Sequence, residues 1–189
     1  MAETLMGISA VPNSHPLFIG NLGMHGNLAA NEMSQQSDLI IAVGMRFSDR
    51  VTGDVKTYAP LAQIIHIDID PAEIGKNMPA HIPIVGNLRQ VLGELNKLMS
   101  EDSPWQAPAQ WVETVTDRKR RYDEKEIPDT PGYVEPKCFM RLLSQRMEDD
   151  AVLCADVGQN QIWSANHFGV RQGRFLTSGG MGTMGYSIP

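Results

Sequence analysis

Two loops near the carboxyl end of the chain carry residues that could hold a ligand. The segment "DVGQNQIW" follows an apolar stretch and offers the neutral hydrogen-bonding side chains of Gln159 and Asn160, and "TSGGMGTMG" follows another apolar stretch. Glycines let the backbone of the second segment approach a ligand closely, and Met184 adds an apolar wedge. Taken singly, such features are more often a turn and a core methionine. Because loops that follow neighbouring strands converge at one sheet edge, we predict a single pocket formed by both.

Two earlier loops indicate sites for a nucleotide-like ligand. "NLGMHGNLAANEM" places Gly23 and Gly26 before an expected helix, where backbone amides stabilise a phosphate. A tight turn is the more frequent explanation of such a glycine pair, and a lone histidine such as His25 is more often packed or exposed than a ligand. "GMRFSDRVTG" directly follows a strand and places Arg46 to meet a phosphate or a ring system, with an ion pair between Asp49 and a neighbouring arginine as the alternative.

An acidic pair follows the next strand. Asp68 comes about 24 residues after Gly44, close to the spacing of the acid that binds a ribose hydroxyl in dinucleotide folds, although no complete G-x-G-x-x-G motif precedes it. Asp70 is expected to cap a short helix in "DPAEIG", with Pro71 first in the helix and Glu73 three residues after the cap. A ribose contact by Asp68 is therefore favoured over a metal held by both aspartates.

The elements that must position these loops alternate between strands and helices. Apolar runs predict a buried strand over 39–43 and a second strand over 63–70. "HIPIVGN" predicts a third strand before a helix with an apolar stripe over 88–99. This alternation indicates an α/β fold with a doubly wound, Rossmann-like parallel sheet, whose ligands lie beyond the carboxyl ends of the strands.

Composition divides the chain into two α/β domains. Residues 101–135 are rich in proline and charge and are interpreted as a linker with a helix over 111–122. Residues 1–100 form the nucleotide-binding-type domain, and 136–189 begin a second domain with a helix, a strand, a glycine loop and a helix start. Since the first domain lacks a preceding strand and the second stops at its glycine loop, both are expected to be truncated.

Charge and cysteine content restrict the functional classes. The net charge is -6, and the basic run "RKRR" lies in a polar stretch typical of a solvated helix face, so we expect no nucleic-acid partner and no membrane surface. The 2 cysteines are too few for a disulfide framework, and no apolar run resembles an export signal or a membrane span. A reducing, cytoplasmic location is therefore expected.

Five segments together resemble the catalytic large subunit of acetohydroxyacid synthase (acetolactate synthase), a thiamine-diphosphate enzyme family of branched-chain amino-acid (isoleucine and valine) synthesis. They are "LGMHG", "DLIIAVGMRFSDRVTG", "IIHIDIDPAEIGKN", "DVGQNQIW" and "LTSGGMGTMGYSIP", in the family's order over nearly the whole chain. "RFSDRVTG" and "HIDIDPAEIGKN" are the specific segments. The resemblance implies three α/β domains, of which this chain would hold most of the central one and the opening of the thiamine-diphosphate-binding one.

The resemblance also implies two sets of cofactor-binding residues. An extended FAD, structural and not redox-active in turnover, would contact Leu22, Gly23, Met24, His25, Gly44, Met45, Arg46, Phe47, Ser48, Asp68, Ile69, Asn87 and Leu88. Thiamine diphosphate would contact Gln159, Asn160, Gly182, Thr183 and Met184, with Gly179 and Gly180 near the flavin. This chain departs from the family in two segments: Asn87 and Leu88 stand where Asp-Val is common, and Asn160 stands where a histidine is frequent.

The implied reaction decarboxylates pyruvate on thiamine diphosphate and joins the product to a second 2-keto acid, either pyruvate or 2-ketobutyrate. The activating glutamate and the Mg²⁺ ligands of the family lie outside this chain, so the chain alone is expected to be inactive. The family also implies a homodimer or tetramer of catalytic subunits and a regulatory small subunit. Two alternatives are a related pyruvate oxidase or decarboxylase, and a non-catalytic FAD- or nucleotide-binding module.

Overall fold

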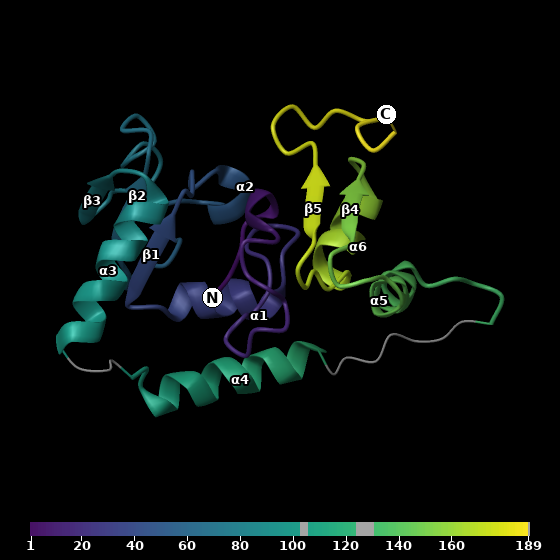
Figure 1. Ribbon diagram of the computed structural model, residues 1–189, viewed down its shortest axis with the longest axis horizontal. Helices are drawn as coiled ribbons and strands as arrows, with labels where there is room; N and C mark the ends of the chain where they lie inside the picture. The colour runs from purple at the N-terminus through teal and green to yellow at the C-terminus, as the bar shows by residue number, and fades with distance from the viewer. Residues whose placement is uncertain (103–105, 124–130, 189) are drawn as a thin grey trace. The chain divides into compact units, whose positions relative to one another are not determined.

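The computed structural model describes residues 1–102, 106–123 and 131–188. Its contacts divide the chain into two compact units (Figure 1). Unit one comprises Met1–Asn31 and Val115–Pro189, and unit two comprises Glu32–Thr114. The predicted linker falls partly outside the described residues, at 103–105 and 124–130, and the family's domain boundaries stay a prediction. None of the helices in the described ranges is both long enough and apolar enough to cross a membrane.

A parallel sheet forms the centre of unit two. Its strands are β1 (Leu39–Val43), β2 (Gln63–Asp68) and β3 (Ile82–Val85), in the order β1-β2-β3, and Val43 lies opposite Ile67. The predicted α/β fold with parallel strands is confirmed. Parallel pairing brings the carboxyl ends of all three strands to one edge of the sheet.

The first strand is buried on one face only. Leu39, Ile41 and Val43 are exposed by 47%, 48% and 41%, whereas Ala42 is buried. The predicted strand is present with the predicted bounds, but it is buried on one face and not on both. Alternate side chains of a strand point to opposite faces, and only one face of β1 is covered here. The core beneath the covered face consists of Ala42, Met45, Phe47, Tyr58, Ala59, Ile64 and Met78.

The segment after β2 forms turns and not the predicted short helix. Asp70 Oδ1 accepts a hydrogen bond from the Ala72 backbone N–H at 2.9 Å, as a helix cap would. Glu73, however, binds Lys76 at 3.0 Å, so it is not the reciprocal partner that a capping box needs. Gly75, at φ 72°, interrupts the turn with a left-handed residue, which prevents a helix from continuing.

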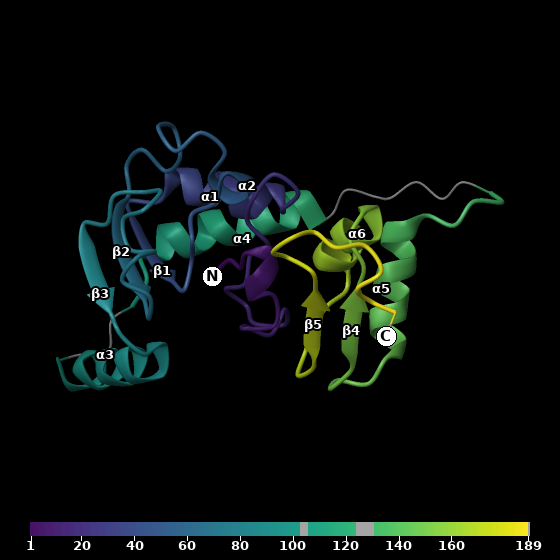
Figure 2. The same cartoon turned by 90° about the horizontal axis from the view of Figure 1, so that it is seen from above.

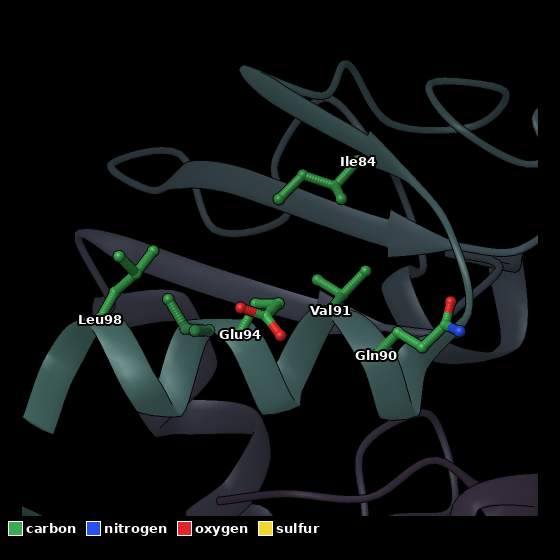
Figure 3. A pocket seen from close by; sticks show the side chains of 6 residues that line it. Ile84, Gln90, Val91, Glu94 and Leu98 are labelled. Carbon is green, nitrogen blue, oxygen red and sulfur yellow. The ribbon is translucent and has the colours of Figure 1, made fainter.

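The predicted helix over 88–99 is confirmed as part of α3 (Leu88–Asp102). Its apolar stripe faces the sheet at β3 and leaves a groove of about 410 Å³ (Figure 3). The groove is lined by Ile84, Gln90, Val91, Glu94, Leu95 and Leu98. Two further helices lie in this part of the chain. Helix α1 (Leu28–Gln36) precedes β1, and the short helix α2 (Asp49–Thr52) follows it.

Unit one contains a second pair of parallel strands, β4 (Val152–Ala155) and β5 (Arg174–Thr177), as Figure 2 shows. Helices α5 (Pro136–Arg146) and α6 (Gln159–His167) precede and follow β4. The buried core of this unit joins the strands to the start of the chain, and it consists of Ile8, Ala155, Ala165, Phe168, Val170 and Phe175. An N-terminal 3-10 turn, η1 (Leu5–Gly7), lies in the same unit.

Two further sequence predictions concern the ends of this unit. The helix expected over 111–122 is confirmed as part of α4 (Ala109–Asp123). The helix start expected after the glycine loop is instead a turn over 184–187, in which the Ile188 backbone N–H donates to the Gly185 carbonyl at 3.4 Å.

Candidate functional site

Three of the segments predicted to bind FAD lie at the carboxyl edge of the β1-β2-β3 sheet: 44–48, 68–69 and 87–88. The Gly44 backbone N–H donates to the Ile67 carbonyl at 2.8 Å, and the Gly86 N–H donates to the Asp68 carbonyl at 2.9 Å. Each loop therefore leaves its strand beside the next loop. A Cβ placed at Gly44 would lie 3.4 Å from a methyl of Leu88, which shows that the first and third loops are also adjacent. The structure thus brings Gly44–Ser48, Asp68, Ile69, Asn87 and Leu88 to one edge.

The loop that carries Arg46 is fixed by the turn after β2. The Asn77 side-chain amide donates to the Arg46 carbonyl at 2.8 Å, and Glu73 Oε2 lies 4.0 Å from Arg46 Nε. The Arg46 side chain is nevertheless 78% exposed, so its guanidinium is open to a ligand. Asp49, the ion-pair partner considered above, accepts the Arg50 backbone N–H and forms no ion pair within the described residues.

Phe47 anchors the same loop from the core side. It is buried, at 1% exposure, and its ring makes edge contacts with Tyr58 at 6.4 Å and with His66 at 5.2 Å between centroids. Its φ of 50° is a left-handed conformation that a bulky residue rarely adopts. The buried ring therefore holds the backbone directly after Arg46 in a set conformation.

Asp68 and Asn87 are already engaged in local hydrogen bonds. Asp68 Oδ1 accepts the Asp70 backbone N–H at 2.9 Å, while its Oδ2 forms no bond within the described residues. Asn87 Oδ1 accepts the Arg89 backbone N–H at 3.0 Å and so caps α3. An acceptor on Asp68 is left for a ribose hydroxyl, and on Asn87 only the amide nitrogen is left for an adenine.

The remaining flavin segment, Leu22–His25, lies in unit one. Asn31 brackets it, because its side chain accepts the Gly23 N–H at 2.9 Å and donates to the Gly23 carbonyl at 2.8 Å. The Asn166 side chain on α6 donates to the His25 carbonyl at 2.7 Å. The loop is thereby fastened to the helix that begins with the predicted thiamine-diphosphate residues. Met24 is 66% exposed.

The two carboxyl-terminal loops follow β4 and β5 at the same sheet edge. Ala155 lies opposite Thr177 in the parallel register, and the Thr177 hydroxyl donates to the Ala155 carbonyl at 2.9 Å. The Gln161 side chain donates to the same hydroxyl oxygen at 2.5 Å. Asp156 then accepts the Gly185 N–H through both carboxylate oxygens, at 2.9 and 2.8 Å. The register and these bonds bring the two loops together, and a pocket formed by both stays a prediction.

The donors of these loops fit the ring portions of thiamine diphosphate. Gln159 and Asn160 open α6 after Gly158, which supplies no side-chain cap, and Met184 is 77% exposed. A Cβ at Gly182 would meet nothing within 4 Å, so the backbone there borders open space. Neutral amides and an apolar side chain suit the neutral aminopyrimidine ring of that cofactor, whereas neither loop carries a lysine or arginine for a diphosphate.

The chemistry in unit two fits FAD. The exposed Arg46 guanidinium matches a phosphate, and the free oxygen of Asp68 matches a ribose hydroxyl at the carboxyl edge of a parallel sheet. No group of three or more His, Cys, Asp or Glu residues suited to a metal occurs in the part of the chain that the structure describes.

Among the groups of unit one whose pKa values are shifted are Asp156 and His167. Hydrogen bonds from the backbone N–H groups of Gly185 and Val157 lower the pKa of Asp156, so it is ionised at neutral pH. Burial, together with the positive charges of Arg141 and Lys137, lowers the pKa of His167 from 6.5 to about 4. Asp156 is therefore an anionic acceptor and His167 a neutral imidazole near pH 7.

Comparison with known proteins identifies the family. Residues 1–95, just over half of the chain, match the model of the thiamine pyrophosphate enzyme central domain, and residues 156–189 match the C-terminal TPP binding domain of the same enzymes. The chain belongs to the thiamine pyrophosphate enzyme family. The second match begins at Asp156 and includes both carboxyl-terminal loops, in agreement with the resemblance found in the sequence.

Within the thiamine pyrophosphate enzymes, the chain is similar to large subunits of acetolactate synthases. Over its whole length the chain is 41% identical to a probable acetolactate synthase large subunit of Methanococcus aeolicus, 44% to the acetolactate synthase large subunit of Corynebacterium glutamicum and 38% to that of Haemophilus influenzae. The match covers 34%, 30% and 33% of those proteins. The chain thus spans about a third of the length of the curated relatives it matches.

Sequence reasoning missed the residues that hold these loops in place. Asn31, Asn77, Asp156 and Asn166 each bind the backbone of a predicted cofactor loop. The sequence did contain a signal for Asp156. It directly follows a strand and shortly precedes Gly158, and an aspartate in such a turn readily accepts hydrogen bonds from backbone N–H groups. The three asparagines had none, because their partners lie in other segments whose approach depends on the tertiary fold.

Proposed function

We propose that this chain is part of an acetolactate synthase catalytic subunit, which joins decarboxylated pyruvate to a second 2-keto acid, pyruvate or 2-ketobutyrate. The product would serve isoleucine and valine synthesis. FAD and thiamine diphosphate with Mg²⁺ would be the cofactors. The whole enzyme would be a homodimer or tetramer with a regulatory small subunit. The metal ligands and the activating glutamate would come from outside this chain, and the 189 residues alone would not turn over pyruvate.

One observation carries the proposal most directly. The loops after β4 and β5, which contain Gln159, Asn160 and Gly182–Met184, are bound to each other through Asp156 and Gly185 at the carboxyl edge of parallel strands. Open α/β sheets bind ligands at this edge. The same residues lie inside the match to the C-terminal TPP binding domain, which supports a cofactor pocket here.

The residues of this chain would bind and orient, and the cofactor would supply the chemistry. When bound, thiamine diphosphate would supply the electron sink that the decarboxylation of a 2-keto acid needs. Gln159 and Asn160 would hydrogen-bond its neutral ring, and Met184 would press against that ring from its apolar side. Asn160 offers hydrogen bonds but no titratable proton, so it would orient and not transfer a proton.

FAD would lie in an extended form along the loops of the central domain. Arg46 would bind its diphosphate or flavin, Asp68 its ribose, and Asn87 and Leu88 its adenine. Gly44–Ser48 and Ile69 would complete the contacts within unit two. The resemblance also assigns Leu22–His25, Gly179 and Gly180 to the flavin. The flavin would be structural, which separates this proposal from an oxidase in which flavin accepts electrons.

Flavin retention tests the assignment of the central domain. The purified chain would be mixed with FAD and desalted, and its flavin absorbance and fluorescence recorded, alongside Arg46→Ala and the matched control Lys56→Ala. Lys56 is an exposed cation of the same unit. We expect the native chain and the control to retain flavin, and Arg46→Ala to lose it by at least about tenfold in affinity, as a lost charge-assisted contact would cause.

Two results would count against the assignment. Equal retention by the native chain and Arg46→Ala would remove Arg46 from the site. No retention by a native chain with normal circular dichroism would mean that these loops do not bind FAD by themselves.

A further inference from the structure

The glycine loop after β5 is fastened at both ends and exposed in its middle. At its start, the Thr177 hydroxyl binds the Ala155 carbonyl, and the Ser178 hydroxyl oxygen accepts the Thr183 backbone N–H at 3.0 Å. In the middle, Met181 and Met184 are exposed by 94% and 77%. The conformation of the middle residues therefore depends on what holds the two ends.

The far end of the loop is held by one carboxylate. Asp156 accepts the Gly185 N–H at 2.9 and 2.8 Å and the Tyr186 N–H through Oδ1 at 3.3 Å, and its own chain neighbour Val157 donates at 2.8 Å. Gly185 lies 29 residues further along the chain, so these bonds join the end of β4 to the end of the glycine loop. In Figure 1 the C-terminal segment leaves β5 and crosses over toward the carboxyl end of β4.

A carboxylate is the side chain that this position needs. Three backbone N–H groups converge on it, and an ionised carboxylate offers only acceptors. An asparagine of the same shape would present an NH₂ group to at least one of these donors. Gly185 itself has φ 85°, a left-handed conformation open to glycine, and this conformation directs its N–H to Asp156.

We propose that Asp156 is a positioning residue that holds the glycine loop, residues 178–186, in the conformation that presents Gly182–Met184 to thiamine diphosphate. Its carboxylate acts through the backbone of Gly185 and Tyr186 and does not touch the cofactor. The inference rests on the proposed function for the identity of the ligand. The holding of the loop rests only on the contacts above.

Amide hydrogen exchange tests the holding of the loop without any cofactor. The native chain, Asp156→Asn and the control Asp150→Asn would be labelled with ¹⁵N and their exchange followed by NMR. Asp150 is an exposed aspartate just before β4. In Asp156→Asn we expect the Gly185 and Tyr186 amides to exchange about tenfold faster, while amides of β4 and β5 keep their rates and the control matches the native chain. Unchanged exchange at Gly185 and Tyr186 would overturn the inference.

A titration with thiamine diphosphate and Mg²⁺ on the same samples tests the positioning role. We expect the Thr183 and Met184 amide signals of the native chain and of Asp150→Asn to shift, and Asp156→Asn to bind about tenfold more weakly. An aspartate that only stabilised the fold would change the exchange rates but leave the affinity equal, which would contradict the positioning role. Absence of any shift in the native chain would show that this loop does not bind thiamine diphosphate by itself, and the exchange data would still decide whether Asp156 holds it.

Discussion

The side chain of Asn31 forms two reciprocal hydrogen bonds with the backbone of Gly23. Its Oδ1 accepts the Gly23 N–H at 2.9 Å and its Nδ2 donates to the Gly23 carbonyl at 2.8 Å. Gly23 has φ 112°, so this residue adopts a conformation that most side chains exclude. A helical asparagine thus sets the shape of the loop "LGMHG", which the sequence places among the flavin-binding segments.

Asn31→Ala should destabilise the loop and the unit that contains it. Two partly buried hydrogen bonds are lost, each worth about 1 kcal/mol, so the free energy of unfolding should fall by about 1 to 2 kcal/mol. Urea denaturation followed by circular dichroism measures this change. Gln36→Ala on the same helix, at an exposed position, should have little effect. Equal effects of both substitutions would show that the two hydrogen bonds between Asn31 and Gly23 add nothing to the free energy of unfolding.

His66→Leu should stabilise the protein. His66 is 1% exposed in β2, and within the described residues neither of its ring nitrogens has a hydrogen-bond partner. A buried polar group without a partner costs free energy that an apolar side chain of similar size avoids, so the free energy of unfolding should rise by about 1 kcal/mol. His81→Leu is the matched control of opposite sign, because the Ile64 N–H donates to His81 Nδ1 at 3.0 Å. Destabilisation by His66→Leu would contradict the claim that the ring nitrogens of His66 lack a hydrogen-bond partner.

The stability of the chain should depend on pH through His167. Burial, the largest cause, and the charges of Arg141 and Lys137 lower its pKa from 6.5 to about 4. Between these values the unfolded chain binds the proton and the folded chain does not, so the free energy of unfolding should fall as the pH is lowered through this range. His167→Gln should show a smaller fall in its urea midpoint between about pH 7 and about pH 5, whereas His25→Gln, at an exposed position, should follow the native chain. Parallel curves for the native chain and His167→Gln would contradict the assignment.

Glu3 should give the free energy of unfolding the opposite dependence on pH. Burial raises the pKa of Glu3 above its ordinary 4.5, although the Val11 backbone N–H donates to it. Above pH 4.5 the unfolded chain has lost this proton while the folded chain retains it until its raised pKa, so the free energy of unfolding falls as the pH rises through this window. Glu3→Gln keeps an acceptor for Val11 and removes the buried charge. It should therefore raise the thermal midpoint at neutral pH, and a lower midpoint would show that the charge has a partner.

The fold was largely predictable because its patterns are local. The apolar run before Gly44 and the helical stripe over 88–99 each reflect the period of one element, and both elements are present. The helix expected from "DPAEIG" does not form. Glu73 pairs with Lys76 instead of closing a capping box, and the left-handed Gly75 turns the chain. The exposure of one face of β1 also escaped prediction, since a run of apolar residues does not tell which face is covered.

The positions of the candidate loops were predictable where residue types and the preceding strand mark them. Glycines and Arg46 after strands mark loops that approach a ligand, and the structure places them at the sheet edges. Asn77 and Asn166 could not be found in this way. Each fixes a loop that lies 31 or 141 residues away, and such a contact exists only once the tertiary fold has formed.

The most direct test of the proposed function is the product formed from pyruvate by the complete reading frame that contains these 189 residues. The expressed protein would be supplied with thiamine diphosphate, Mg²⁺ and FAD, and the 189-residue chain would be assayed beside it. We predict acetolactate from the complete protein and none from the chain alone. Acetaldehyde or an oxidised acetyl product from the complete protein, or no turnover by it, would contradict the acetolactate synthase proposal.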